Sequence, residues 1–370
     1  MKAIFALSIV SIALFSCSSD NSLPNREKTK SAKEDKFVLK KTNYYELEGF
    51  INNSPVKMEL ISQDSLIHGS YVDVNDGISK QVNGKIYPNG ELELNETDNL
   101  GDITAIFSGK FSSATRFSGL WGKINSKNKL AFELKLNSTK KLEFSIEHLT
   151  NKNCSTIQNI PEGDEMMPWD TMCTTLKVDL LSIIVQNELI SKKINQKLEK
   201  EYCKFAVGEV RPQTIKEFIR SVDNIEQDYG FEQEVWGRIE SFSHQTICIS
   251  ISSYYYGFGA AHPYSFGNFY NYNCNTGKLV RLEELLIPNF KNKLNSIAEK
   301  LFIEANGDEL WWFEKGKFEL NRDFAIMPTG LLFVFDAYEI GPYAAGAPEV
   351  FIPYSKIKHL IKDKSLLNKN

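Results

Sequence analysis

Between about residues 37 and 150, apolar residues alternate with polar ones, which is the two-residue period of a strand that buries one face. The alternating sets are Leu47-Gly49-Ile51, Val56-Met58-Leu60, Leu92-Leu94, Ile103-Ala105-Phe107 and Phe132-Leu134-Leu136. Turn-forming residues such as Pro88-Asn89-Gly90 separate these sets. Hairpin therefore follows hairpin, and the pattern predicts an antiparallel β-meander or a small open barrel over residues 37–150.

A four-residue period replaces this alternation after Cys173 and predicts amphipathic helices. The helical stretches are 190–202, 214–225 and 294–302, and strand-like runs occupy 235–242, 246–256, 266–274, 324–327, 330–337 and 350–354. Most of these runs are joined by links too short for a parallel crossover. We therefore expect residues 151–370 to form an α+β domain with an antiparallel sheet and about three helices.

The start of the chain resembles a bacterial lipoprotein signal. Lys2 precedes an uncharged apolar run, Ala3–Phe15, which ends at Ser16-Cys17 and is too short to span a bilayer. The resemblance implies a signal peptide over 1–16 and a Cys17 that carries a diacylglyceryl group and a further acyl chain such as palmitate. An ordinary secretory signal is the alternative. Residues 17–36 are rich in Ser, Asn, Lys and acidic residues, so they are expected to form a flexible tether.

Composition narrows the classes of partner. The chain has a net charge of −4, so it offers no basic field that would collect nucleic-acid phosphates. Hydrophobic residues make up 42% of the chain, and no second long apolar run occurs, which predicts a globular protein held at a membrane by lipid. Ser18 follows Cys17, which favours sorting to the outer membrane of a Gram-negative cell. The predicted location is therefore the cell envelope, on its periplasmic or surface face.

If lipid occupies Cys17, an odd number of cysteines remains and at least one of them is unpaired. The others are Cys154, Cys173, Cys203, Cys248 and Cys274. The first two bracket a loop containing Pro and Gly, whose closure would contribute about 3 kcal/mol. The last two lie at equal distances from Ala261, so a hairpin turning there would place them opposite one another. These two pairs are candidate disulfides, and Cys203 is the expected free thiol.

Three motifs in the second half occur in a recognisable order. They are Gly259-Ala260-Ala261-His262-Pro263, then Asn275-Thr276-Gly277-Lys278, then Tyr338-Glu339-Ile340-Gly341-Pro342-Tyr343-Ala344-Ala345-Gly346. From about Thr174 to Leu366, the chain resembles a family of extracellular domains of unknown function. That family includes domains of a lysozyme-binding anti-sigma-V factor, of a peptidoglycan deacetylase outside its catalytic domain, and of many envelope lipoproteins. The resemblance implies an α+β fold and a lysozyme-like protein or peptidoglycan as partner.

The residues of these motifs have architectural interpretations as well. Glycine and proline allow or fix the backbone of turns, and His262 precedes a proline that keeps it out of the helical region. His262 is thus either a hydrogen-bonded turn residue or a contact in a binding groove. Tyr338, Glu339 and Tyr343 form either a recognition edge or a set of groups that cap buried backbone. These four residues are the candidate binding set.

The sequence lacks the common short motifs that mark catalytic sites. The chain contains no G-x-S-x-G, H-E-x-x-H or P-loop motif, and its five histidines show no metal-ligand spacing, so no cofactor or metal is expected. We therefore expect a non-catalytic protein that binds or senses a lysozyme-like protein or cell-wall glycan. Two alternatives remain: an envelope hydrolase that uses His262 with Asp336 or Glu339, and an apolar-ligand carrier built on the N-terminal sheet.

Overall fold

The computed structural model describes residues 42–75, 79–97, 102–137, 142–156, 171–185, 187–207, 211–224, 230–243, 245–362 and 364–367. The predicted signal peptide, the tether and the lipidation site Cys17 lie outside the described residues. Within the described ranges, no helix has both the length and the apolar character needed to cross a membrane.

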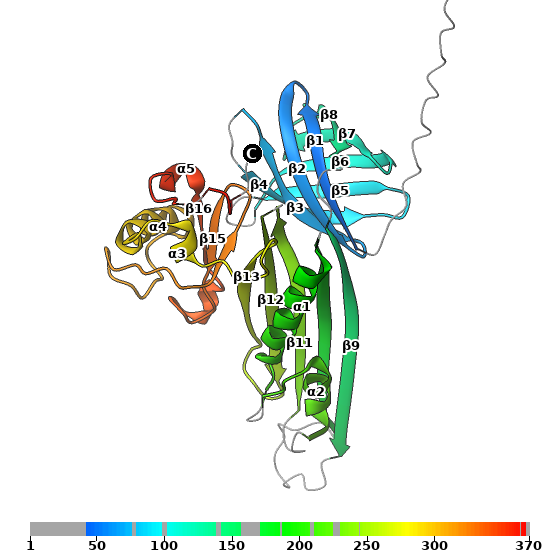
Figure 1. Cartoon of the computed structure of the whole chain (residues 1–370), viewed down its shortest axis with the longest axis vertical. Helices are drawn as coiled ribbons and strands as arrows, with labels where there is room; N and C mark the ends of the chain where they lie inside the picture. Colours follow the sequence, from blue (N-terminus) through cyan, green and yellow to red (C-terminus); the bar gives the residue numbers. More distant parts are fainter. Residues whose placement is uncertain are drawn as a thin grey trace, which may run out of the picture. The chain divides into compact units, whose positions relative to one another are not determined.

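Eight antiparallel strands close into a barrel (Figure 1, blue to blue-green). They are β1 (Thr42–Ile51), β2 (Ser54–Gln63), β3 (Leu66–Asp73), β4 (Ser79–Ile86), β5 (Glu91–Thr97), β6 (Ile103–Ser113), β7 (Arg116–Lys123) and β8 (Leu130–Leu136). Each strand pairs with the next one in the sequence, and β1 also pairs with β8, from Leu47 opposite Leu136 to Ile51 opposite Phe132. The predicted meander is confirmed, and its two edges join to form a closed barrel.

Side chains of its own strands fill the barrel interior. Phe111 and Phe117 stack with ring centroids 5.0 Å apart, and Phe117 meets Phe132 edge-on at 4.8 Å. Other buried residues of this core are Leu47, Met58, Leu60, Ile67, Tyr71, Ile86, Leu94, Phe107 and Leu134. A small barrel packed by its own side chains is the expected result for eight strands. The structure therefore gives no support to an apolar-ligand carrier in this barrel.

Two glycines allow the barrel strands to approach one another closely. A Cβ at Gly69 would lie 1.8 Å from the carbonyl oxygen of Glu59, and one at Gly84 would lie 1.8 Å from that of Glu93. No side chain fits at such a distance from a backbone oxygen. The glycines that punctuate the alternating sequence are thus required by strand packing.

A second sheet of five strands follows, in the spatial order β13-β12-β11-β10-β9. The strands are β9 (Glu143–Thr156), β10 (Thr171–Ile184), β11 (Phe231–Phe242), β12 (Thr246–Gly257) and β13 (Tyr264–Asn273). The predicted domain boundary at residue 150 falls within β9, because β9 pairs along its whole length with β10. The barrel strands end at Leu136, before that boundary.

The prediction of an antiparallel sheet is wrong at one pair, because β10 and β11 run parallel, from Thr174 opposite Phe231 to Asp179 opposite Trp236. The link between them contains α1 (Glu188–Cys203), α2 (Ile215–Arg220) and the 3₁₀ helix η1 (Ser221–Asn224). A helical link of this length permits a parallel crossover. The sheet is therefore mixed.

Helix α1 covers one face of this sheet (Figure 1). The Asn187 side chain caps its first turn by accepting hydrogen bonds from the backbone N–H groups of Leu189 and Ile190. Ile194, Leu198 and Tyr202 recur every fourth residue, and all three are buried against the strands. The helical period predicted for this stretch is confirmed.

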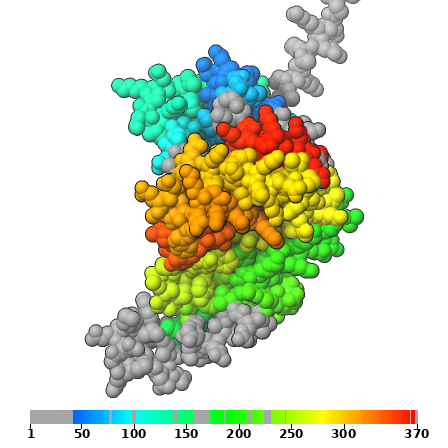
Figure 2. All heavy atoms as spheres, turned by 90° about the vertical axis from the view of Figure 1, so that its left-hand side faces the viewer, coloured from blue at the N-terminus to red at the C-terminus, as the bar shows by residue number. Residues whose placement is uncertain are grey.

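The C-terminal part adds a three-stranded antiparallel sheet of β14 (Phe324–Ile326), β15 (Gly330–Val334) and β16 (Glu349–Pro353). Its helices are α3 (Leu282–Leu285), α4 (Lys291–Asn306) and α5 (Tyr354–Ile357), with a short 3₁₀ helix, η2 (Tyr343–Ala345). Of these, α4 was predicted, whereas α3 and α5 are single turns too short to show a period. Figure 2 shows the surface that these segments form, coloured yellow to red.

Cys154 and Cys173 lie directly opposite one another on β9 and β10 and form the predicted disulfide. The second predicted pair is wrong, because Cys248 and Cys274 are both free and buried. The β12–β13 register places Cys248 opposite Asn271, three residues before Cys274. An odd offset puts two side chains on opposite faces of a sheet. Cys203 is also free and buried.

Candidate functional site

His262, Tyr338 and Tyr343 come together, although they lie far apart in the sequence. His262 lies in the turn between β12 and β13, and the two tyrosines lie in the connection between β15 and β16. The rings of His262 and Tyr343 stack with centroids 3.7 Å apart. The Tyr338 ring lies 5.5 Å from that of Tyr343 and 6.2 Å from that of His262. We call these three residues the aromatic surface.

Hydrogen bonds hold the two loops of the aromatic surface together. The Tyr343 hydroxyl donates to the carbonyl oxygen of Pro263 at 2.7 Å. The Tyr338 hydroxyl lies 3.3 Å from Nε2 of His262, and Nδ1 of His262 lies 3.1 Å from the Pro263 carbonyl oxygen. The rings are therefore fixed relative to each other by these contacts.

Tyr338 has an unusual backbone for a bulky residue. Its φ is 70°, in the left-handed region that favours glycine. Its side chain is 49% exposed, so burial of the ring does not offset the strain. A strained residue that presents a ring to solvent is typical of a functional position.

Glu339, the fourth candidate residue, has a different role. Its Oε2 atom accepts a hydrogen bond from the backbone N–H of Asp336 at 2.9 Å and lies 3.4 Å from Nδ2 of Asn321. These contacts fold the loop back on itself and fix the position of the neighbouring Tyr338. Glu339 is thus part of the support of the aromatic surface.

Partly buried carboxyl groups lie close to the aromatic surface. Asp323 accepts a hydrogen bond from the backbone N–H of Phe269 at 2.6 Å. Burial raises the pKa of Asp323 to about 7, and the negative charges of Asp336 and Glu339 add to this effect. Burial also raises the pKa of Asp336 and of the Tyr264 phenol, which faces the same two acidic residues. The charge of this region therefore changes near neutral pH.

The geometry around His262 does not form a catalytic pair. Its two ring nitrogens face a backbone carbonyl and a phenol, and within the described ranges no carboxylate makes a hydrogen bond to it. In a triad-type site, a carboxylate orients the histidine ring and stabilises the charge that forms on it. The predicted hydrolase alternative, His262 with Asp336 or Glu339, thus lacks that contact.

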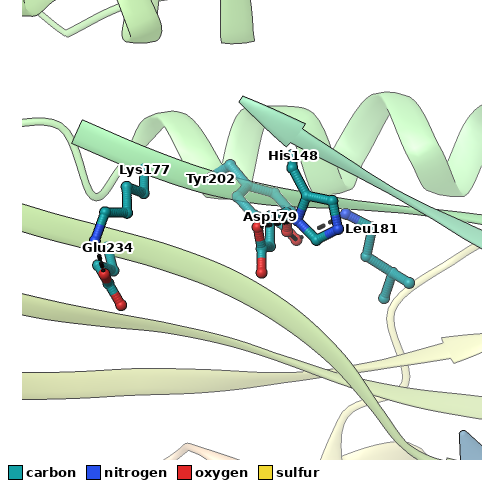
Figure 3. A network of polar contacts seen from close by, with 6 residues as sticks. All are labelled: His148, Lys177, Asp179, Leu181, Tyr202 and Glu234. Carbon is teal, nitrogen blue, oxygen red and sulfur yellow. Dashed lines mark hydrogen bonds and ion pairs between the residues drawn. The ribbon is translucent and has the colours of Figure 1, made fainter. Parts of the chain in front are cut away.

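A second polar region, which the sequence did not point to, lies on the solvent face of β9, β10 and β11 (Figure 3). Nδ1 of His148 lies 2.7 Å from the Asp179 carboxylate. On the same face, Lys177 donates hydrogen bonds to Glu232 and Glu234. Alternation marks this face as polar, but it does not reveal which polar side chains pair across strands.

The Tyr202 hydroxyl lies against the backbone of β10, beside Asp179 and Leu181 (Figure 3). It accepts a hydrogen bond from the backbone N–H of Leu181 at 3.0 Å and donates to the carbonyl oxygen of Asp179 at 2.8 Å. A Cβ at Gly237 would lie 2.1 Å from this hydroxyl, so only glycine fits there. The β10–β11 pairing ends at Asp179 and Trp236, directly before this point.

Metal ligands do not gather in the part of the chain that the structure describes: it holds no group of three or more His, Cys, Asp or Glu side chains that could bind an ion.

Comparisons with known proteins match the C-terminal part to a family. Residues 279–355 match the model of DUF3298, a protein family of unknown function. This range includes Tyr338, Glu339 and Tyr343, whereas His262 precedes it. The match supports the predicted resemblance of the C-terminal half to a domain family of unknown function. No curated protein matches the chain.

Two solved structures are similar to this chain. A member of the DUF3298 family from Bacteroides fragilis NCTC 9343 has 16% identity and a TM-score of 0.49, over 61% of this chain and 96% of that one. A DUF3298 family protein from Pseudomonas aeruginosa PAO1 has 20% identity and a TM-score of 0.47, over 62% of this chain and 98% of that one.

Proposed function

We propose that this chain, whose residues 279–355 match the DUF3298 family, is an envelope lipoprotein that binds a protein or glycan ligand without catalysing a reaction. The observation that carries this proposal is the aromatic surface of His262, Tyr338 and Tyr343. In this proposal, lipid on Cys17 holds the protein at the outer membrane. The ligand is a lysozyme-like protein or cell-wall glycan.

Rigid aromatic rings suit ligand binding for two reasons. They offer a large apolar area with polar atoms at the edge, which is why tyrosine is enriched at the centres of interfaces. They also lose little conformational entropy on binding when they are already fixed, as the stacked rings of His262 and Tyr343 are. Both a protein surface and the apolar face of a sugar ring can pack against such rings.

Calorimetric titration of the mature chain with lysozyme and with muropeptides tests the binding function. Cys17→Ser keeps the protein free of lipid for this measurement. We expect binding to at least one ligand and a loss of tenfold or more in affinity for Tyr338→Ala and for His262→Ala. Phe50→Ala is the matched control, since Phe50 is a 54% exposed aromatic residue on barrel strand β1, and it should leave the affinity unchanged.

Failure of both ligands to bind at high micromolar concentration would overturn the binding proposal. The anchor is tested separately in cells by labelling with a palmitate analogue. We expect label on the wild-type chain and none on Cys17→Ser, with the variant released from the membrane fraction. Equal labelling of both chains would exclude Cys17 as the lipidation site.

A further inference from the structure

A groove of about 990 Å³ lies where the barrel meets the five-stranded sheet. The β2–β3 hairpin and strands β4 and β5 line one wall, and β9, β10 and β11 line the other. Leu66 and Tyr87 stand on the barrel side of the groove and are 59% and 48% exposed. Its size is that of sites that hold small ligands.

Arg238 contributes a positive charge to this groove, whose lining also carries Lys85 and the carboxylates of Asp64, Glu93 and Asp179, the last of them paired with His148. In the described part of the chain, no carboxylate forms an ion pair with it, whereas the nearby acidic residue Glu240 accepts a hydrogen bond from the Ser250 hydroxyl. The Arg238 guanidinium is held through its Nε atom, which lies 3.0 Å from Nε2 of His68. Its two terminal amino groups are thus available to a ligand.

His68 is suited to hold Arg238 because it is neutral. Its side chain is buried, and burial together with the Arg238 charge lowers its pKa to about 4. Nε2 of His68 also lies 2.9 Å from the carbonyl oxygen of Ile239. A neutral ring makes one of these bonds at a time, since it accepts from Arg238 in one tautomer and donates to Ile239 in the other.

Trp236 places an aromatic ring beside this charge. Trp236 and Arg238 are two residues apart on β11, so their side chains project from the same face of the sheet. The Trp236 backbone lies opposite Asp179, which in turn lies opposite His148. Figure 3 shows the His148 ring directed at the Asp179 carboxylate, an arrangement that leaves Nε2 of His148 for another partner.

We propose that this groove is a second binding site, which takes a carboxylate-bearing ligand: the carboxylate binds Arg238 and the adjoining ring or apolar part packs on Trp236. A guanidinium binds a carboxylate through two parallel hydrogen bonds, so the ligand is fixed in orientation as well as held. An acidic sugar and the C-terminus of a peptide both carry this chemistry. The groove shares no residue with the aromatic surface, so a failed binding test at one of these proposed sites does not decide the test at the other.

Calorimetry on the mature chain with two charged probes and their neutral counterparts tests this proposal. The charged probes are digalacturonate and trialanine, and the neutral ones are digalactose and trialanine amide. We expect at least one charged probe to bind tenfold or more tightly than its neutral counterpart. Binding of digalacturonate alone identifies an acidic sugar, binding of trialanine alone identifies a peptide terminus, and binding of both identifies the carboxylate as the common determinant.

Variants connect the binding to the groove. Arg238→Gln should abolish the preference for the charged probe, and Arg238→Lys should weaken its binding, since an ammonium lacks the fork geometry. Trp236→Leu keeps the Arg238–His68 contact and should weaken the same probe fivefold or more. Lys177→Gln is the matched control, because Lys177 lies exposed on the same sheet face but outside the groove.

The proposal is overturned if none of the probes binds at 10 mM, or if charged and neutral probes bind equally. It is also overturned if Arg238→Gln and Trp236→Leu, folded by circular dichroism, both bind as the wild type does.

Discussion

Tyr338 combines a positive φ with an exposed ring, so its backbone strain lowers the free energy of unfolding without a compensating gain from burial of the ring. The left-handed conformation costs a residue with a Cβ about 1 kcal/mol, a cost that glycine avoids. Tyr338→Gly should therefore be more stable than Tyr338→Ala by about 1 kcal/mol, although both remove the ring. Urea unfolding of the two variants measures the difference.

Equal stability of these two variants would show that the loop relaxes away from the left-handed conformation. The comparison also separates strain from binding, because both variants should lose affinity for the ligand of the aromatic surface to the same extent.

Asp323 should make the stability fall as the pH rises. Its pKa is raised from 3.8 to about 7 in the folded protein, so the folded chain keeps a proton that the unfolded chain has released. The stability that this proton supplies is fully present below about pH 4 and is lost as the pH rises through 7. Relative to wild type, Asp323→Asn should gain up to about 4 kcal/mol between pH 4 and pH 8, at about 1.4 kcal/mol per pKa unit. Unfolding by urea at several pH values measures this.

This prediction would be contradicted if the free energies of unfolding of wild type and Asp323→Asn changed with pH in parallel. Asparagine is the appropriate substitution, because its amide oxygen can still accept the hydrogen bond from the backbone of Phe269.

The motifs single out His262, Tyr338 and Tyr343 as candidates, but the contact between the two loops that carry them could not be predicted. Tyr343 and Pro263 are 80 residues apart, and their hydrogen bond depends on how the two loops meet. The same limit explains the cysteines. Cys154 and Cys173 pair as predicted, whereas the shift of three residues between Cys274 and the partner of Cys248 depends on where the hairpin turns.

At the scale of elements, the Tyr202 hydroxyl determines where β10 and β11 part. It makes two backbone hydrogen bonds within the sheet, to Leu181 and Asp179. Tyr202→Phe should lower the free energy of unfolding by about 1–3 kcal/mol, because it leaves a buried backbone donor and acceptor unpaired. Denaturant unfolding measures the loss.

Tyr272→Phe is the matched control for Tyr202→Phe. Tyr272 is equally buried and belongs to the same core, but its hydroxyl has no hydrogen-bond partner among the residues that the structure describes. Removing that hydroxyl should be neutral or stabilising. A loss of stability as large as that of Tyr202→Phe would show that the cost comes from packing and not from the two backbone bonds.

Helices and strands with a clear hydrophobic period could be predicted from the sequence, whereas the pairing of the strands could not. The period-two sets of the barrel are visible because one face of each strand is buried, as with Leu92 and Leu94 on β5. Closure of the barrel depends on Leu47 meeting Leu136 across the whole domain, which no local pattern encodes. Likewise, the helices before β11 were predicted, but they did not show that β11 returns parallel to β10.

At the scale of the whole molecule, His68 should make the junction between barrel and sheet sensitive to acid. Its pKa is lowered from 6.5 to about 4 by burial and by the Arg238 charge, against the opposing effect of Glu240. The folded state therefore resists protonation that the unfolded state accepts, so stability is fully present above pH 6.5 and falls as the pH approaches 4.

His68→Gln removes this titration. The stability advantage of wild type over the variant should shrink by about 3 kcal/mol between pH 7 and pH 4, at about 1.4 kcal/mol per pKa unit. Guanidinium unfolding of both proteins across this pH range measures the change. If the free energies of unfolding of wild type and His68→Gln differed by the same amount at every pH, His68 would have the same pKa in the folded and the unfolded chain. Because His68 and Asp323 respond to pH in opposite directions, each is best followed by its own variant.

Closure of the barrel also has a mechanical consequence. Among the barrel strands, Thr42–Glu46 of β1 pair with β2 alone, whereas Leu47–Ile51 pair with β2 on one edge and with β8 on the other. Two further bonds hold the first segment: the Thr42 hydroxyl donates to the Phe144 carbonyl oxygen, and the Asn137 N–H donates to the Glu46 carbonyl oxygen. A force that pulls on the chain before Thr42 first acts on a segment held by one strand ladder and these two further bonds. At Leu47 it meets two rows that must break together, so β1 has a built-in stop against extension.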